Sequence, residues 1–300
     1  MPEPFLMTGP FAHADGAPRR RVLVTGAAGR IGSVFAEQAR ARYDLRLMVR
    51  PGAADGAQAK LGGYGEVVEG DLADLDALKR LCRGIDTVLH LAGDPGDDAT
   101  WATLLPANIV GAYHMVVAAK AAGCRRVIYA SSVHAGSGYP PDFQARTSDP
   151  VNPGNLYGVT KCFGEALARY MAEQEGLSVI AVRIGAFKTP ETIAAAGPEG
   201  LQYLDSWISP RDMVQLFTRC IDAEQVRFAL VHGVSNNRFR RFDSSDASRL
   251  LGYAPQDDSA VVNPVLQAMG ARDRVGRLSV TQSGEASGVR DDLGVPSGRS

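Results

Sequence analysis

A glycine-rich turn near the start of the chain constrains its fold more than any other feature. A short apolar segment at 22–24 is followed by TGAAGRIG at 25–32, and apolar residues then recur at helical spacing over 31–42. Glycines permit a tight turn, a close approach of the backbone to a phosphate, and close packing of helix on strand. The start of the helix offers free N–H groups to an anion. We therefore predict a dinucleotide-binding loop that includes Gly26, Gly29, Arg30, Ile31 and Gly32.

Strand-like and helix-like segments alternate from residue 21 to residue 184, which predicts parallel strands joined by right-handed crossovers. Apolar strands such as 87–91 fit a sheet that is buried on both faces. The expected fold class is α/β, a Rossmann-like doubly wound parallel sheet with a small C-terminal substrate-binding cap. Strands are expected at 22–24, 45–49, 66–69, 87–91, 126–130 and 178–184, and helices at 31–42, 74–83, 109–122 and 155–175.

The same pattern predicts the organisation of the whole chain. The Rossmann domain is expected over 21–185, and a small substrate-binding region over 186–269, with a helix at 210–223 and a strand at 229–232 that return to the sheet. The ends contain few bulky apolar residues, so a disordered leader is expected at 1–20 and a disordered tail at 270–300.

Composition and charge narrow the classes of function. The net charge of -1 disfavours a nucleic-acid partner, which calls for a basic surface. No run of about 18 uncharged apolar residues predicts a membrane span. The cysteines lie far apart without a CxxC pair, at 82, 124, 162 and 220, which disfavours both a zinc site and a disulfide framework. We expect a cytoplasmic protein without a metal site that acts on a small molecule, with a homodimer left open.

The end of the second strand bears on the choice of cofactor. An acidic residue there binds the ribose of NAD, whereas a nearby arginine accommodates the 2′-phosphate of NADP. The segment 45–49 ends without Asp or Glu, and Arg50 follows it, so NADP is favoured and NAD stays open. The alternative for Arg50 is an ordinary surface position. After the third strand, Asp71 is a candidate contact to the adenine amine, or a helix N-cap, or both.

Tyr157 and Lys161 form a YxxxK pattern, and positions four apart share one face of a helix. A free tyrosine has a pKa of about 10 and is a poor base at neutral pH, but a cation one turn away favours the phenolate. Ser132 ends a predicted strand and offers a hydroxyl to the substrate oxygen. These three residues predict a catalytic centre for proton transfer.

Together, these motifs resemble a known family, the extended short-chain dehydrogenases, also called the NAD-dependent epimerase/dehydratase family. The resemblance covers about 21–255 and rests on TGAAGRIG (25–32), GDL (70–72), HLAG (90–93), Asn108 before a helix, ASS (130–132), LYGVTKCFGE (156–165) and VRIG (182–185). It implies catalytic roles for Ser132, Tyr157 and Lys161. It also implies a further set of cofactor contacts, namely Leu72, Leu91, Ala92, Gly93, Asn108 and Ile184, besides Tyr157 and Lys161 themselves.

Within this family the chain is most similar to uronate dehydrogenase and related sugar oxidoreductases, through SSVHAGSGYP (131–140) and SWISPRDMVQLF (206–217). The likeness implies substrate contacts for His134, Arg183 and Trp207 as well as Ser132, with core packing as the alternative for His134 and Trp207. Val133 stands where uronate dehydrogenases usually have Asn, and the loop at 94–101 resembles sugar-phosphate dehydrogenases. A sugar, a uronate and a sugar phosphate are therefore all candidate substrates.

The function expected from these residues is hydride transfer between a sugar hydroxyl and NAD(P). The second hypothesis is a nucleotide-sugar 4-epimerase that uses NAD transiently, although the region after Gly185 is short for a nucleotide-binding cap. The third is a non-catalytic NADP-binding regulatory protein, which has no need of the Ser132, Tyr157 and Lys161 set.

Overall fold

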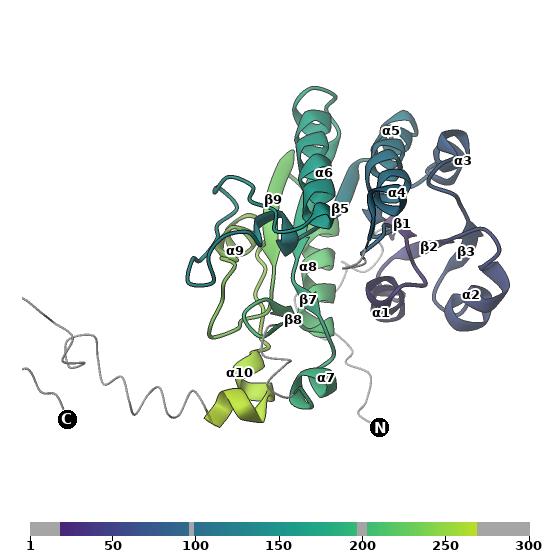
Figure 1. Cartoon of the computed structure of the whole chain (residues 1–300). Coiled ribbons are helices and arrows are strands. Elements are labelled where there is room, and N and C mark those ends of the chain that lie inside the picture. The colour runs from purple at the N-terminus through teal and green to yellow at the C-terminus, as the bar shows by residue number, and fades with distance from the viewer. Residues whose placement is uncertain (1–18, 96–98, 197–202, 269–300) are drawn as a thin grey trace, which may run out of the picture.

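The computed structural model describes residues 19–95, 99–196 and 203–268 (Figure 1). The predicted tail and all but the last two residues of the predicted leader therefore lie outside the described residues. The core is a parallel sheet of seven strands in the order β3-β2-β1-β4-β5-β6-β9. Its strands are β1 (Arg21–Thr25), β2 (Asp44–Val49), β3 (Glu66–Glu69), β4 (Thr87–His90), β5 (Arg126–Ser132), β6 (Ser178–Ile184) and β9 (Phe228–Gly233). The predicted doubly wound α/β class is confirmed.

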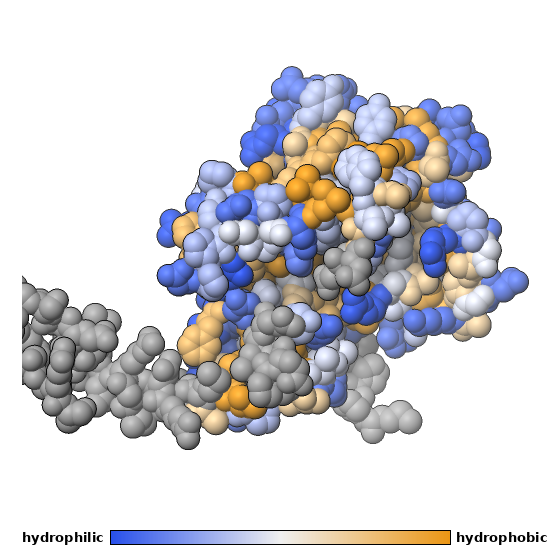
Figure 2. All heavy atoms as spheres, in the orientation of Figure 1, coloured by the Kyte–Doolittle hydropathy of each residue, from blue (hydrophilic) through white to orange (hydrophobic). Residues whose placement is uncertain are grey.

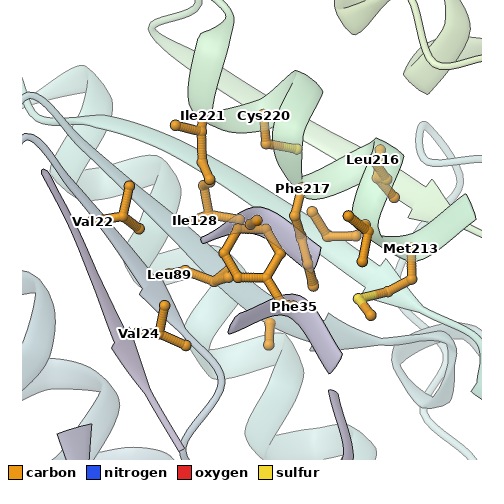
Figure 3. Close-up of a cluster of buried hydrophobic side chains, with 14 of the residues drawn as sticks. Val22, Val24, Phe35, Leu89, Ile128, Met213, Leu216, Phe217, Cys220 and Ile221 are labelled. Atoms are coloured by element: carbon orange, nitrogen blue, oxygen red, sulfur yellow. The ribbon is translucent and has the colours of Figure 1, made fainter. Parts of the chain in front are cut away.

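Helices cover both faces of the sheet. One face carries α1 (Arg30–Ala39), α2 (Ala54–Leu61), α8 (Pro210–Asp222) and α9 (Ser245–Leu251), and the other carries α3 (Leu75–Leu81), α5 (Gly111–Ala121) and α6 (Leu156–Glu173). Figure 3 shows how the first face closes: Phe35 of α1 meets Phe217 of α8 edge to face over the apolar strands, with ring centroids 6.0 Å apart. Because both faces are buried, the central strands are mostly apolar, and their polar residues lie chiefly at the strand ends.

The helix expected at 109–122 begins earlier than the sequence pattern indicated. It runs from Trp101 to Ala121 as α4 (Trp101–Leu104), a π-helical turn η1 (Leu105–Val110) and α5. Pro106 lies inside the wide turn, where its carbonyl accepts from Gly111 N. By length and composition, this is a helix that could cross a membrane, with 44% of its apolar window buried inside the protein.

The C-terminal region returns to the sheet, as predicted. Ser209 caps α8 by accepting from Asp212 N at 3.1 Å, and β9 pairs in parallel with β6. The remaining elements are short: a 3-10 turn η2 (Val133–Gly136), a two-stranded sheet of β7 (Ala186–Phe187) and β8 (Trp207–Ile208), α7 (Pro190–Ala194) and α10 (Ser259–Val262). Since β7 follows β6 directly, this small sheet begins at the carboxyl edge of the main sheet, where ligands bind in open α/β folds.

Candidate active site

The predicted glycine loop forms a cradle between β1 and α1. Gly26 has a φ of 68°, and a Cβ there would lie 2.9 Å from Ala92 N. A Cβ on Gly32 would lie 2.5 Å from Gly26 O, so helix and turn pack without room for a side chain. The predicted turn and packing positions of Gly26 and Gly32 are thus confirmed. α1 begins after Gly29 with no side-chain cap and no acidic residue in its first turn, which suits an anion.

Thr25 joins this loop to the end of β4, a role that the sequence analysis missed. Its Oγ1 accepts from Leu91 N and Ala92 N, both at 3.1 Å. Its own hydrogen is therefore left for His90 Nδ1, 2.8 Å away. Burial lowers the pKa of His90 to about 3, so this imidazole is a neutral acceptor that fixes the Thr25 hydroxyl.

Asn108 lies in the π-helical turn and is almost fully buried. Its Oδ1 accepts from Asp94 N at 2.7 Å, and its Nδ2 donates to Asp94 O at 3.0 Å and to Thr160 Oγ1 at 3.1 Å. Both amide hydrogens are thus taken by the protein. Asn108 therefore fixes the loop after β4 against α6, and its predicted cofactor contact stays a prediction.

Lys161 is buried on α6 with 6% of its surface exposed. Its Nζ lies 5.3 Å from the ring centres of both Tyr129 and Tyr157, and a Cβ on Gly93 would lie 3.6 Å from it. Within the described ranges it forms no hydrogen bond or ion pair. Burial accordingly lowers the pKa of Lys161 to about 8. A buried ammonium without a partner is costly, and it fits a site that receives polar groups of a ligand.

Ser132, His134 and Tyr157 meet where β5 ends and α6 begins. Ser132 Oγ accepts from His134 N at 3.2 Å, and the His134 ring stands edge-on to the Tyr157 ring with centroids 5.6 Å apart. Gly158 makes this approach possible, because a Cβ there would lie 2.4 Å from His134 O. The structure thus brings the predicted catalytic residues and the predicted substrate contact His134 to one place.

The structure contradicts the expected substrate contact of Arg183. Its guanidinium is 2% exposed and forms a bidentate pair with Glu165, with Nε to Oε1 and Nη2 to Oε2 both at 2.8 Å. Ser131 Oγ also donates to Glu165 Oε1, at 2.5 Å. This buried cluster ties α6 to β5 and β6. The sequence analysis missed Glu165 as its centre.

The expected contact of Trp207 with substrate is also wrong. Trp207 is fully buried, packs with Ile193 and Leu204, and donates its indole N–H to Lys188 O at 2.9 Å. Core packing, which the sequence left as the alternative, is therefore its role.

Arg50 and Asp71, which are predicted to contact the adenosine half of the cofactor, are both exposed. Arg50 follows β2, and its guanidinium makes no hydrogen bond or ion pair with the described part of the chain. The neighbouring carboxylate of Glu69 is already used, since it accepts from Gly52 N at 2.8 Å and Ala54 N at 3.3 Å. Asp71 accepts from the N–H two residues on, and the N-cap of α3 is Asp74 instead.

The other predicted cofactor residues lie along the carboxyl edge of the sheet. Leu91, Ala92 and Gly93 follow β4, and Ile184 ends β6 opposite Ser132. Leu72 packs against the start of α5, and Arg30 and Ile31 open α1. A hollow of about 480 Å³ lined by Arg19, Arg40 and Tyr64 lies elsewhere, near the amino ends of β1 to β3.

A family model described as the NAD dependent epimerase/dehydratase family matches residues 22–197. This chain belongs to that family. The match spans the glycine loop, β4, β5 and α6, which are the elements that form the site.

Relatives align over nearly the whole chain. Uronate dehydrogenase of Pseudomonas syringae pv. tomato is 35% identical, covering 86% of this chain and 89% of the relative. NAD-dependent glucose-6-phosphate dehydrogenase of Haloferax volcanii is also 35% identical, over 80% and 94%. L-arabinose 1-dehydrogenase (NAD(P)(+)) from the same organism is 34% identical, over 81% and 98%. Among solved structures, uronate dehydrogenase from Agrobacterium tumefaciens in complex with NAD has a TM-score of 0.71 at 32% identity, covering 81% of this chain and 87% of that one.

Proposed function

We propose that this protein is an NAD(P)-dependent dehydrogenase that oxidises the anomeric hydroxyl of a cyclic sugar to a lactone. The observation that carries the proposal is the buried ammonium of Lys161, which has no hydrogen-bond or ion-pair partner among the described residues and lies one helical turn from Tyr157 and beside Gly93. The alignment of sugar dehydrogenases over at least 80% of this chain supports it further. The nucleotide-sugar epimerase hypothesis has less support.

The residues at the carboxyl edge of the sheet fit a dinucleotide. The glycine loop and the uncapped start of α1 suit its pyrophosphate, and Lys161 suits the hydroxyls of a ribose. When bound, the nicotinamide supplies the hydride acceptor. Tyr157 takes the proton from the sugar hydroxyl, Ser132 holds the same oxygen through its Oγ, and the Lys161 cation favours the phenolate form of Tyr157.

The candidate substrates differ in the charge that the site must accept. The charge of Arg183 is already balanced by Glu165, so we expect the carboxylate of a uronate to need another cation. The test is a panel of a uronate, glucose 6-phosphate and L-arabinose, each with NAD and NADP, followed by the absorbance of the reduced cofactor. Net formation of reduced cofactor supports a dehydrogenase, whereas conversion of a nucleotide sugar without it supports an epimerase.

Tyr157→Phe tests the role of the phenol on the substrate that the panel identifies. Turnover should fall by about 100- to 10,000-fold, because only the proton-transferring hydroxyl is lost. Cofactor affinity should hardly change. A loss below tenfold removes Tyr157 from the proposed role.

We further propose that NADP is preferred over NAD. The support is the exposed guanidinium of Arg50, which has no partner in the part of the chain that the structure describes, and the engagement of the neighbouring Glu69 carboxylate by backbone N–H groups. A charge-assisted hydrogen bond of about 1.5–3 kcal/mol predicts that Arg50→Ala weakens NADP binding by roughly 10- to 150-fold and leaves NAD binding unchanged. Arg80→Ala on the exposed side of α3 controls for overall charge. A wild-type preference for NAD contradicts the proposal.

A homodimer through α4, η1, α5 and α6 is our proposal for assembly. Seven of the large apolar side chains that are exposed in the described residues lie on these helices: Trp101, Leu105, Tyr113, Leu156, Val159, Phe163 and Tyr170. Figure 2 shows apolar surface gathered there. Two adjacent helices about 30 Å long present roughly 600 Å², near what a stable interface needs from each partner. Each copy of the chain carries this whole apolar face, so two copies can bury it against each other around a two-fold axis.

Light scattering tests this assembly. Wild type should have the mass of a dimer, and Phe163→Glu with Tyr170→Glu should yield a monomer. The matched control is Phe239→Glu, which changes an exposed aromatic away from these helices. A monomeric wild type, or binding of the wild type to lipid vesicles through this face, contradicts the proposal.

We also propose a cytoplasmic location. It is supported by the four cysteines, which are all free thiols.

A further inference from the structure

Asn155, the N-cap of α6, contacts both the helix and His134. Its Oδ1 accepts from Gly158 N at 2.8 Å, which is the usual bond of an N-cap side chain. Its Nδ2 lies 3.1 Å from His134 Nδ1. One side chain thus starts the helix that carries Tyr157 and Lys161 and also touches the imidazole beside them.

The cap bond decides the polarity of the second contact. Gly158 N–H can only donate, so the atom of Asn155 that faces it must be the carbonyl oxygen. The amide nitrogen of Asn155 therefore faces His134, and because it has hydrogens but no free acceptor site, His134 Nδ1 must accept. A neutral imidazole has one N–H, which then lies on Nε2.

The backbone on both sides of this contact is held in place. Asn152 N donates to Ala135 O at 2.9 Å, Gly138 N donates to Asn152 O at 2.7 Å, and Gly154 N donates to Ser137 Oγ at 3.1 Å. These hydrogen bonds hold the segment before α6 against η2. They thereby hold the backbone segments from which the side chains of Asn155 and His134 extend.

We propose that Asn155 is a positioning residue that holds His134 in the tautomer with its proton on Nε2, so that this nitrogen is a hydrogen-bond donor rather than an acceptor beside Tyr157. What the donor contacts rests on the proposed function. The tautomer itself rests only on the hydrogen bonds of Asn155.

Side-chain ¹⁵N spectra of the folded protein test the tautomer without any substrate. The His134 signals are assigned by their loss in His134→Gln. Asn155→Ser and Asn155→Asp both keep a good N-cap, so α6 should form in each. Wild type should show the Nε2–H form, the Ser variant a mixture of tautomers, and the Asp variant a proton on Nδ1, because a carboxylate can only accept. An Nδ1–H form in wild type, or an unchanged spectrum in both variants, overturns the proposal.

Kinetics test the consequence for the site. Asn155→Ser should lower kcat/KM by roughly 2- to 10-fold, the loss that one neutral hydrogen bond accounts for. In a His134→Ala background the same substitution should have no further effect, whereas an undiminished loss there overturns the positioning role. If no sugar is turned over, the proposed function fails, and the spectra still decide the tautomer.

Discussion

Two buried cations, Lys161 on α6 and Arg183 on β6, differ in whether they pair with an acidic side chain. Arg183 is 2% exposed and forms two hydrogen bonds with Glu165, whereas Lys161 is 6% exposed and has no such partner in the described residues. Both cations are almost fully buried, and Lys161 lies four positions from Glu165 on the same helix, so a difference in burial does not explain why only Arg183 is paired in that part of the chain. The difference comes from whether the protein supplies the counter-charge.

In our proposal, this difference separates a structural charge from a functional one. The pair between Arg183 and Glu165 is satisfied, and it fixes the helix that carries Tyr157 on the strands below it. The ammonium of Lys161 is kept charged at a cost, which indicates that its partner arrives with a ligand. A resemblance at the level of motifs assigned both residues to ligands, and only the contacts distinguish them.

Removing the partner of Arg183 should have the largest effect on stability. Glu165→Gln leaves a buried guanidinium without its counter-charge, which should lower the free energy of unfolding by about 3–5 kcal/mol and the melting temperature by roughly 6–20 °C. Calorimetry of wild type and variant measures both.

The double replacement Glu165→Met with Arg183→Met is the matched control. Because it removes both charges and keeps the volume, it should recover most of the lost stability. A double variant no more stable than Glu165→Gln would mean that the pair is not what makes Glu165 important.

Lys161→Met should do the opposite and stabilise the cofactor-free protein. The pKa of Lys161 falls from 10.5 to about 8 on burial, so its charge opposes folding at pH 7. Removing it should raise the free energy of unfolding by about 1–3 kcal/mol, taking roughly 1.4 kcal/mol per pKa unit as an upper guide. Denaturant unfolding at pH 7 checks the sign, and a less stable variant contradicts it.

The advantage of Lys161→Met should also depend on pH. Because the folded-state pKa is the lower one, the cost of the charge is fully present below about pH 8 and is relieved as pH rises toward 10.5. The two stabilities should therefore converge over this window. Tyrosines far from Lys161 titrate alike in both proteins and cancel in the difference, and Tyr157→Phe in both backgrounds removes the one tyrosine whose proton Lys161 is proposed to control. A gap that is constant from pH 7 to pH 10 would mean that burial of the charge is not its cause.

The sequence predicted the sheet and the glycine turn, because each depends on local spacing within one or two neighbouring elements, and it named Ser132, Tyr157 and Lys161, whose catalytic role stays a prediction. It placed the helix of Trp101–Ala121 too short, since the π-helical turn at Leu105–Val110 interrupts the usual periodicity. It left out α2 and α7, which are short helices without a strong apolar repeat.

The sequence pattern could not predict contacts between segments that are distant in the chain. Glu165 and Arg183 are both polar residues in apolar surroundings, and nothing in the spacing indicates that they pair. The substrate contact of Trp207 was predicted from the surrounding motif, but its indole packs in a small buried cluster with Leu204. Asn155 had a visible signal, a good N-cap residue before a helix, but its second partner His134 is far away in the chain.

The most direct test of the contrast between the two cations is the thermal stability of wild type and Lys161→Met with and without cofactor. A ligand at 100 times its Kd stabilises the folded state by about 2.7 kcal/mol. Without cofactor the variant should melt at the higher temperature, and saturating NADP or NAD should raise the melting temperature of wild type clearly more than that of the variant. The account is contradicted if the variant is the less stable protein without cofactor, or if the cofactor stabilises both proteins equally.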